Sequence, residues 1–273
     1  MKKYDRLCES LKKYNRLAVA LSGGADSALV LSAALAALGP DCVLAMTIIS
    51  PLMPENEAAG ARKLAASLGA EHVFVSFDAI PPEVSANGRD RCYFCKRSML
   101  GAMIYRASES GYAVVAEGSN LDDLSTYRPG LRAVRELGAI SPLIEAGFTK
   151  SEVYEALREL KLPVCDKPSS ACLATRIPYG TELTDERLKA VGEGEEMLRS
   201  YGFNSCRLRH HGDIARIEVP KEDFQRLCQS DITASIRRLG FTYVTMDLDG
   251  LRSGSMDKAP EIKKGQQHEP GGS

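Results

Sequence analysis

The sequence predicts an α/β protein in which a parallel β-sheet is followed by a smaller α+β domain. Short apolar runs alternate with longer runs patterned as helices, as expected for consecutive βα units. The segment Val43–Ile49 is an almost continuous apolar run, which is typical of a parallel strand buried on both faces. The apolar run Leu17–Leu21 leads directly into a polar, glycine-rich turn, and ligands of open α/β sheets bind at such strand ends.

The first domain is expected to span residues 1–165. Its predicted strands are Leu17–Leu21, Val43–Ile49, His72–Phe77 and Tyr112–Ala116. Its predicted helices are Asp5–Tyr14, Ala28–Leu38, Pro54–Leu68, a helix from about Lys96 to Ser110, Leu131–Leu137 and Thr149–Leu160. Gly39-Pro40 is a helix stop, and Thr149 with Glu152 matches a capping box. Pro163 and Pro168 then interrupt the chain, so a domain boundary is expected there.

The second domain is expected to span residues 166–252 as a small α+β unit. A helix is predicted at Thr184–Tyr201, with Thr184 as its N-cap. Two strands, Cys206–His210 and Ile214–Val219, should form a hairpin, followed by helices within Lys221–Leu239 and a strand at Thr242–Asp247. Residues 253–273 contain almost nothing to bury, which predicts a disordered tail.

The composition is that of an ordinary globular protein of 273 residues, with 44% hydrophobic and 26% charged residues. The formal net charge of −1 provides no general basic field, so we expect no nucleic-acid partner. No apolar run of about 18 residues is present, and the N-terminus is not signal-like, so we expect no membrane partner and a cytoplasmic location. In that compartment the eight cysteines indicate thiols, metal ligands or catalysts before disulfides.

The turn Ser22–Ser27, with sequence SGGADS, is the strongest signal for a binding site. It lies between a strand and a helix N-terminus, where unpaired amides and the helix dipole attract anions. Gly23 and Gly24 allow close approach of the backbone, Ser22 and Ser27 add hydroxyls, and Asp26 can hold a cation or position water. No lysine follows as in a Walker A motif. The alternative is an ordinary capped turn.

A second polar turn, Glu117–Asp123, follows the fourth predicted strand and should open onto the same edge of the sheet. Gly118 could admit a ribose. Asp122 or Asp123 could hold Mg²⁺, which prefers carboxylate oxygens together with phosphates. The alternative is a solvated acidic loop.

A third segment, Lys167–Gly180, places Cys172 in a loop near the domain boundary. Lys167 and Arg176 provide nearby positive charge, which favours the reactive thiolate. Considered alone, a loop cysteine is more often inert.

Two resemblances connect these segments. SGGADS resembles the PP-loop of the ATP pyrophosphatase superfamily, whose members have a Rossmann-like sheet, cleave ATP between the α and β phosphates and adenylate a substrate oxygen. The whole pattern resembles the LarE family of ATP-dependent sulfur transferases. The matching segments are SGGADS, RCYFCK, EGSNLDD, YRPGLRAVRELGAISPL, KPSSACLATRIPYG and RLRHHGDIARIEV.

The LarE resemblance implies a small-molecule substrate, a pyridinium-3,5-dicarboxylate mononucleotide, whose carboxylates become thiocarboxylates of the nickel-pincer cofactor of lactate racemase. It implies that ATP with Mg²⁺ binds at Ser22, Gly23, Gly24, Asp26, Ser27, Thr47, Gly118 and Asp123. Thr47 would contact adenine through its backbone. Cys172 would carry the sulfur, Arg207 and Arg209 would bind a phosphate or carboxylate, and Glu195 and Glu218 would lie near the site. We also expect a homo-oligomer.

The LarE resemblance leaves two alternatives for the source of the sulfur. In one subgroup the cysteine at position 172 surrenders its own sulfur and becomes dehydroalanine. In another, three cysteines, here Cys92, Cys95 and Cys172, hold a [4Fe-4S] cluster whose open iron binds hydrosulfide. The three cysteines favour the cluster, while a zinc site with Cys165 stays an alternative. The rival functions are a PP-loop thiolase acting on tRNA, a glutamine-dependent amidotransferase synthetase and a nucleotide sensor.

Overall fold

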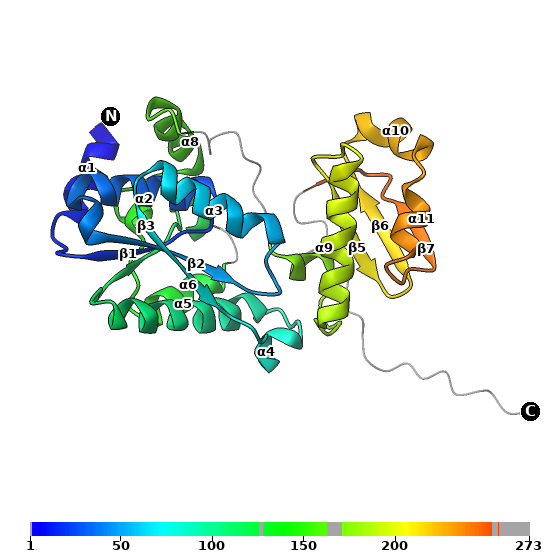
Figure 1. Cartoon of the computed structure of the whole chain (residues 1–273), viewed down its shortest axis with the longest axis horizontal. Helices are drawn as coiled ribbons and strands as arrows, with labels where there is room; N and C mark the ends of the chain where they lie inside the picture. The colour runs from blue at the N-terminus through cyan, green and yellow to red at the C-terminus, as the bar shows by residue number, and fades with distance from the viewer. Residues whose placement is uncertain (1, 126–127, 163–170, 253–255, 257–273) are drawn as a thin grey trace, which may run out of the picture. The chain divides into compact units, whose positions relative to one another are not determined.

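The computed structural model describes residues 2–125, 128–162, 171–252 and 256. These residues form two compact units (Figure 1). Unit 1 contains the described residues up to Val84 together with Asp90–Cys172, and unit 2 contains Ser85–Arg89 and the described residues from Leu173 onward. The boundary predicted between residues 165 and 166 lies outside the described residues. So does the tail predicted for residues 253–273, apart from Met256.

The core of unit 1 is a four-stranded sheet with the strand order β3-β2-β1-β4. The strands are β1 (Leu17–Ala20), β2 (Val43–Ile49), β3 (Glu71–Ser76) and β4 (Val115–Ala116). All three strand pairings are parallel, which confirms the predicted α/β class. The first strand therefore lies inside the sheet, and the turn that follows it opens at the carboxyl edge, between β2 and β4.

The fourth strand is shorter than the prediction of Tyr112–Ala116. The amide of Tyr112 donates to the carbonyl of Ala107, so this residue completes the end of the preceding helix rather than joining the sheet. Gly111, with φ 78°, makes the turn between the two. Only Val115 and Ala116 remain to pair with β1.

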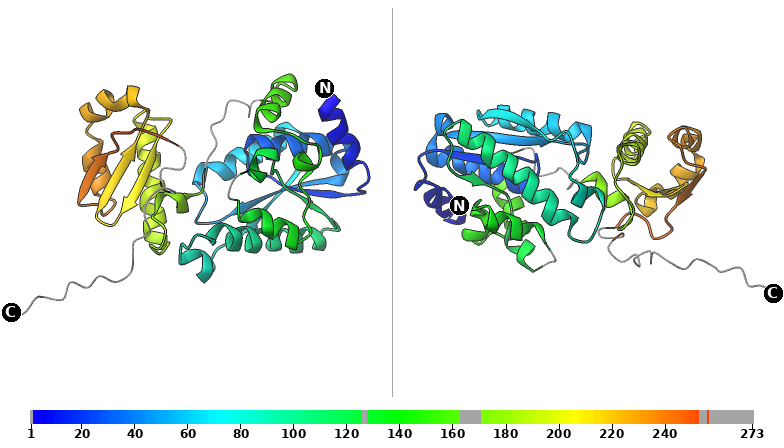
Figure 2. Two further views of the ribbon diagram at one scale, coloured as in Figure 1. Left: turned by 180° about the vertical axis from the view of Figure 1, so that it is seen from behind. Right: turned by 90° about the horizontal axis from the view of Figure 1, so that it is seen from below.

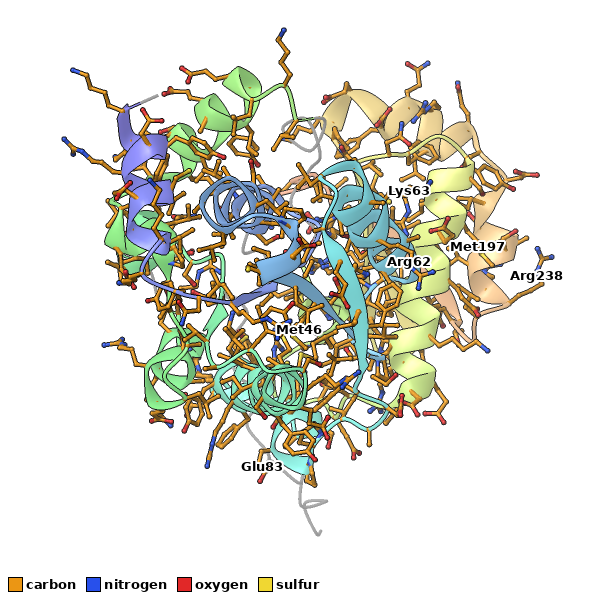
Figure 3. All side chains as sticks on the ribbon, turned by 60° about the vertical axis from the view of Figure 1, so that its left-hand side comes forward. Met46, Arg62, Lys63, Glu83, Met197 and Arg238 are labelled. Carbon is orange, nitrogen blue, oxygen red and sulfur yellow. The ribbon has the colours of Figure 1, made fainter. Side chains whose placement is uncertain are left out.

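Helices cover both faces of the sheet (Figures 1 and 2). One face packs against α1 (Lys2–Leu11), α2 (Ala25–Leu38), α3 (Glu55–Ser67) and α8 (Lys150–Glu159), and the other against α5 (Arg91–Glu109) and α6 (Gly130–Glu136). Alternation along β1 explains the two layers, because Leu17 and Val19 face the first set and Ala18 faces the second. In Figure 3 Met46 of β2 lies inside this packing, and it has no exposed surface.

Short helical segments complete unit 1. They are η1 (Pro40–Cys42), α4 (Pro82–Ser85), whose last residue is assigned to unit 2, η2 (Leu121–Leu124) and α7 (Pro142–Glu145). The predicted capping box of α8 is confirmed, because Thr149 accepts from the amide of Glu152 and the Glu152 carboxylate accepts from the amide of Thr149. None of the described helices is long and apolar enough to cross a membrane. The cytoplasmic location and the homo-oligomer stay predictions.

Unit 2 is the expected small α+β structure. Its sheet has the order β5-β6-β7, with β5 (Arg207–His211) antiparallel to β6 (Ile214–Glu218) and β7 (Tyr243–Met246) parallel to β6. Its helical segments are η4 (Leu173–Arg176), α9 (Asp185–Ser200), η5 (Lys221–Asp223), α10 (Phe224–Gln229) and α11 (Ile232–Arg237). Gly194 lets α9 approach the sheet closely, because a Cβ there would lie 2.5 Å from Cδ1 of Leu208.

Candidate active site

The SGGADS turn connects β1 to α2 as predicted, but the helix begins at Ala25, so Asp26 and Ser27 belong to its first turn. Gly23 has φ 76°, and a Cβ there would lie 3.3 Å from the backbone nitrogen of Ala61 in α3. Both the backbone conformation and the neighbouring helix therefore favour glycine at this position. The Ser27 hydroxyl donates to the carbonyl of Gly24 over 3.1 Å and accepts from the amide of Ser22 over 3.2 Å, which closes the turn.

The Asp26 carboxylate lies at the centre of a polar network. Asn120 donates to it through Nδ2 over 2.9 Å, and the Lys150 ammonium forms an ion pair with it. The amide of Lys150, at the start of α8, donates to the Asp122 carboxylate over 2.8 Å. Three separate segments thus meet at one carboxylate. Asn120 and Lys150 were not predicted as site residues, although Lys150 is the first residue of a helix with a recognisable capping box.

Glu117 anchors the second polar turn. Its buried carboxylate accepts from Lys96 Nζ over 2.8 Å, from the amide and hydroxyl of Ser119 over 3.1 and 2.8 Å, and from the Ser141 hydroxyl over 2.6 Å. Burial acts to raise the pKa of Glu117, but the charge of Lys96 and these hydrogen bonds outweigh it and hold the pKa below its usual value. Glu117 is therefore ionised, and both of its carboxylate oxygens accept hydrogen bonds.

Gly118 brings this turn into contact with the start of α2. A Cβ on Gly118 would lie 2.9 Å from the backbone nitrogen of Ser27 and 3.2 Å from Cβ of Asp26. The absence of a side chain therefore serves the packing of the two turns, while contact with a ribose stays a prediction. Asp123 accepts from the amide of Asn120 and pairs with Arg128 at 2.9 Å.

Thr47 donates a hydrogen bond to the residue that directly precedes the SGGADS turn. It is fully buried, and its Oγ1 lies 2.7 Å from the carbonyl oxygen of Leu21 and 2.9 Å from Nε2 of His72. Because the single hydroxyl proton goes to the carbonyl, Nε2 of His72 is the donor of the second bond. Burial first, and then the charge of Arg62, lower the pKa of His72. Arg62 projects from α3 in Figure 3, with its guanidinium 4.6 Å from the centroid of the Phe74 ring.

These segments enclose a cavity of about 570 Å³ within unit 1, a size suited to a small-molecule ligand. The polar part is lined by Ser22, Asp26, Ser27, Glu117, Gly118, Ser119, Asn120, Asp122, Asp123, Arg128 and Lys150. The apolar part is lined by Ala20, Leu21, Ile48, Met53, Met99, Leu100 and Met103, with Lys96 beside it. The structure thus brings together the predicted residues Ser22, Asp26, Ser27, Gly118 and Asp123. Gly23, Gly24 and Thr47 do not line the cavity; Gly24 accepts from Ser27 within the turn, and Thr47 donates to Leu21 just before it.

The cysteine pair lies at the start of α5. Cys92 and Cys95 are one helical turn apart, and Cys95 Sγ donates to Met99 Sδ over 3.6 Å. Burial, then the charges of Cys172 and Cys92, raise the pKa of Cys95 to about 12. Cys172 is exposed and lies within electrostatic reach of Cys95. Among the described residues, however, no three His, Cys, Asp or Glu side chains are gathered so that they could hold a metal ion. Cys165 is outside those residues.

Two buried ion pairs characterise unit 2. Glu195 binds Arg176 through two hydrogen bonds of 2.7 and 3.0 Å, and Glu218 binds Arg209 through two of 3.0 and 2.7 Å. Arg209 also donates to the carbonyl of Thr175 over 2.9 Å. The four predicted residues Arg207, Arg209, Glu195 and Glu218 thus lie in one unit, with the acidic members oriented toward arginines.

Comparison with known proteins identifies the family. The NAD synthase family matches residues 4–100. A pyridinium-3,5-bisthiocarboxylic acid mononucleotide synthase of Lactiplantibacillus plantarum is 40% identical over 255 residues, 92% of each chain. The chain belongs to the LarE family. An uncharacterized protein of Synechocystis is 38% identical over 94% of this chain and 97% of its own, and an NH₃-dependent NAD⁺ synthetase of Methanosarcina acetivorans is 28% identical over 68% and 79%.

LarE membership confirms the predicted family and the predicted class of enzyme. The PP-loop alone leaves several ATP pyrophosphatases open, and the NAD synthase match covers residues 4–100, which include that turn. In the sequence, the combination of matching segments, from SGGADS to RLRHHGDIARIEV, distinguished LarE from other ATP pyrophosphatases.

Proposed function

We propose that this LarE-family protein is an ATP-dependent sulfur transferase. It adenylates the carboxylates of a pyridinium-3,5-dicarboxylate mononucleotide and converts them to thiocarboxylates, a step in making the nickel-pincer cofactor of lactate racemase. The observation that carries this proposal is the cavity in unit 1. One wall is the SGGADS turn with Asp26, and another is the helix that bears Cys92 and Cys95. The name of the Lactiplantibacillus relative supports the same substrate.

The first step is attack by a substrate carboxylate oxygen on the α-phosphorus of ATP. The bond from that phosphorus to the bridging oxygen breaks, and pyrophosphate leaves. The amides at the start of α2 and the Ser22 and Ser27 hydroxyls are placed to bind the phosphates. Lys150 can move from Asp26 to the polyphosphate, because a ligand of opposite charge replaces its partner. A sulfur nucleophile then displaces AMP from the acyl adenylate.

Magnesium fits the donor set of this cavity. Asp26, Asp122 and Asp123 supply carboxylate oxygens along its polar part, and Mg²⁺ is commonly bound by one or two carboxylates plus phosphates. When bound, the ion offsets phosphate charge as pyrophosphate departs. Asp26 and Asp123 are the residues we propose as ligands, and both would exchange a present cationic partner for the ion.

The substrate phosphate is proposed to bind on the face of β5 that carries Arg207 and Arg209. Glu218 orients the guanidinium of Arg209 through two hydrogen bonds, and Glu195 does the same for Arg176. In this proposal the two glutamates are positioning residues, and the arginines make the contact with the anion.

The sulfur is proposed to come through Cys92, Cys95 and Cys172 as ligands of a [4Fe-4S] cluster. Three thiolates suit a cluster with one open iron, although the described side chains are not arranged as a metal site. Iron and sulfide analysis after anaerobic purification tests the proposal, with Cys92→Ala expected to lose both. An active Cys92→Ala protein with dehydroalanine at position 172 after turnover would establish the sacrificial route instead.

The function itself is tested by incubating the anaerobic protein with Mg-ATP and pyridinium-3,5-dicarboxylate mononucleotide. We expect pyrophosphate rather than orthophosphate, and a thiocarboxylate product detected by mass spectrometry. Pyrophosphate release that depends on tRNA and not on the pyridinium compound would indicate the rival thiolase.

A further inference from the structure

One side of α5 connects the cavity to the cysteine pair. Cys92, Lys96, Met99 and Met103 are spaced by three or four residues, so they lie along one side of the helix. Lys96, Met99 and Met103 line the cavity. Cys95, next to Lys96 in the chain, reaches Met99 with its thiol. The cavity wall therefore continues along α5 toward the sulfur atoms, and Lys96 lies between the two ends.

Lys96 supplies the positive charge of this wall. Its ammonium is 2.8 Å from the Glu117 carboxylate, and its side chain is 37% exposed. The other cationic side chains that line the described cavity come from elsewhere: Lys150 pairs with Asp26 at the SGGADS turn, and Arg128 pairs with Asp123 beside η2. Lys96 is thus the cavity cation next to the apolar methionines and the cysteines.

Glu117 does not depend on Lys96 for its hydrogen bonds. Without the ammonium, the carboxylate still accepts from the amide and hydroxyl of Ser119 and from the hydroxyl of Ser141. A buried carboxylate that loses its last partner is costly, but this one keeps three donors. The flexible lysine side chain can therefore turn from Glu117 toward an anion in the cavity at a small cost.

We infer that Lys96 forms the subsite for the substrate carboxylate that is adenylated. The inference rests on the proposed function and names the residue that binds this group. A carboxylate must approach the α-phosphate of ATP against strong repulsion between negative charges, and an ammonium beside it offsets that repulsion. The carboxylate oxygen then bonds to phosphorus as pyrophosphate leaves. Lys96 keeps its proton, and nothing is oxidised or reduced.

The surroundings of Lys96 favour an aromatic carboxylate over a phosphate as its ligand. Met99 and Met103 present thioethers and methylenes on the same side of α5, and methionine sulfur packs well against aromatic rings. The polyphosphate has its own donors at the start of α2 and at Lys150. A pyridinium ring against the methionines places a ring carboxylate at Lys96, on the side of the cavity nearest Cys95.

The test compares Lys96→Met with Arg97→Met. Arg97 is the next residue of α5, carries the same charge, is exposed and does not line the cavity. Binding of pyridinium-3,5-dicarboxylate mononucleotide is measured in the presence of Mg²⁺ and α,β-methylene-ATP, a non-cleavable analogue. Binding of the analogue alone is measured as well, together with substrate-dependent exchange of labelled pyrophosphate into ATP. Unchanged analogue binding also shows that each variant is folded.

Lys96→Met should weaken substrate binding by about tenfold to a hundredfold, the loss of one charge-assisted hydrogen bond, with a matching rise in KM for exchange. Affinity for the analogue should not change. Lys96→Arg should recover part of the substrate affinity, and Arg97→Met should behave as wild type. Equal losses for substrate and analogue would assign Lys96 to the nucleotide and overturn the inference, as would substrate binding equal to that of Arg97→Met.

The two proposals fail in different ways. A wild-type protein that neither binds the dicarboxylate nor exchanges pyrophosphate in its presence contradicts the proposed function, and the subsite with it. A wild-type protein that does both, with a Lys96→Met variant that does both equally well, contradicts the subsite alone.

Discussion

Unit 1 and unit 2 both contain ion pairs, but those of the unit 1 cavity are partly exposed and those of unit 2 are buried. In unit 2 the side chains of Arg209 and Glu218 are 6% and 0% exposed and meet through two hydrogen bonds. In the cavity of unit 1, Lys150 and Asp26 are 35% and 23% exposed, and Lys96 faces the cavity beside its partner. A pair open to a cavity can exchange its partner for a ligand, whereas a buried pair holds its arginine in one orientation. Burial therefore distinguishes ion pairs that can exchange a partner for a ligand from ion pairs that hold a side chain in one orientation.

The largest effect is expected from breaking the buried pair. Glu218→Leu leaves the Arg209 charge without its carboxylate, and loss of one member of such a pair costs about 3–5 kcal/mol of unfolding free energy. Urea denaturation measures it. The double variant Arg209→Met/Glu218→Leu should regain most of that stability, since the buried Arg209 charge is removed as well and Arg216, the other partner of Glu218, keeps its ion pair with Asp247. A single variant as stable as wild type would remove the distinction between the two units.

Asp26→Asn, in contrast, should cause a large loss of activity and little loss of stability. Its ion pair is partly exposed, so the free energy of unfolding should fall by only about 0–1 kcal/mol. Substrate-dependent pyrophosphate release should fall at least about a hundredfold, as when a positioned electrostatic group is removed. Asp41→Asn, at an exposed position in η1, is the matched control. Full turnover by Asp26→Asn would show that the SGGADS turn is not the catalytic centre.

Thr47→Val tests the support beneath the turn. The change keeps the shape but leaves the Leu21 carbonyl without its buried donor, which should cost about 1–3 kcal/mol of stability. Thr47→Ser keeps the hydroxyl and should lose less. Because Leu21 directly precedes Ser22, affinity for α,β-methylene-ATP should fall in the same order. Equal nucleotide affinity in both variants would limit Thr47 to a packing role.

The smallest effect concerns pH. The pKa of Glu117 in the folded protein lies below its ordinary value of 4.5, so its contribution to stability is present above that value and is lost as the pH falls through the folded-state pKa. Glu117→Gln should therefore be less stable than wild type near neutral pH, and the difference should shrink on acidification. Thermal unfolding at several pH values measures it, and a difference that grows toward acid would have the wrong sign.

The parts of this site that could be predicted from sequence are those with local signals. Apolar runs predicted the strands, and Gly23 with Gly24 predicted the turn. Both features are determined by residues that are adjacent in the sequence. The ion pair of Asp26 with Lys150 joins residues 124 positions apart, and the bond of Thr47 to His72 joins two strands. No local pattern encodes such partners; they follow from the order of strands in the sheet.

The same limit applies to Arg209 and the cysteines. The LarE resemblance predicted that Arg207 and Arg209 bind an anion, but not that the Glu218 carboxylate accepts two hydrogen bonds from the guanidinium of Arg209. The resemblance predicted Cys92 and Cys95 as ligands of one cluster, whereas the raised pKa of Cys95 reflects burial that depends on how the helix packs.

The central claim is that the substrate carboxylate is adenylated in the cavity of unit 1. The direct measurement uses pyridinium-3,5-dicarboxylate mononucleotide with ¹⁸O in its carboxylates, incubated with the protein and Mg-ATP. After sulfur transfer, the account predicts one ¹⁸O atom in the phosphate of AMP and none in pyrophosphate, because the carboxylate oxygen attacks the α-phosphorus. Unlabelled AMP, or label in orthophosphate, would contradict it.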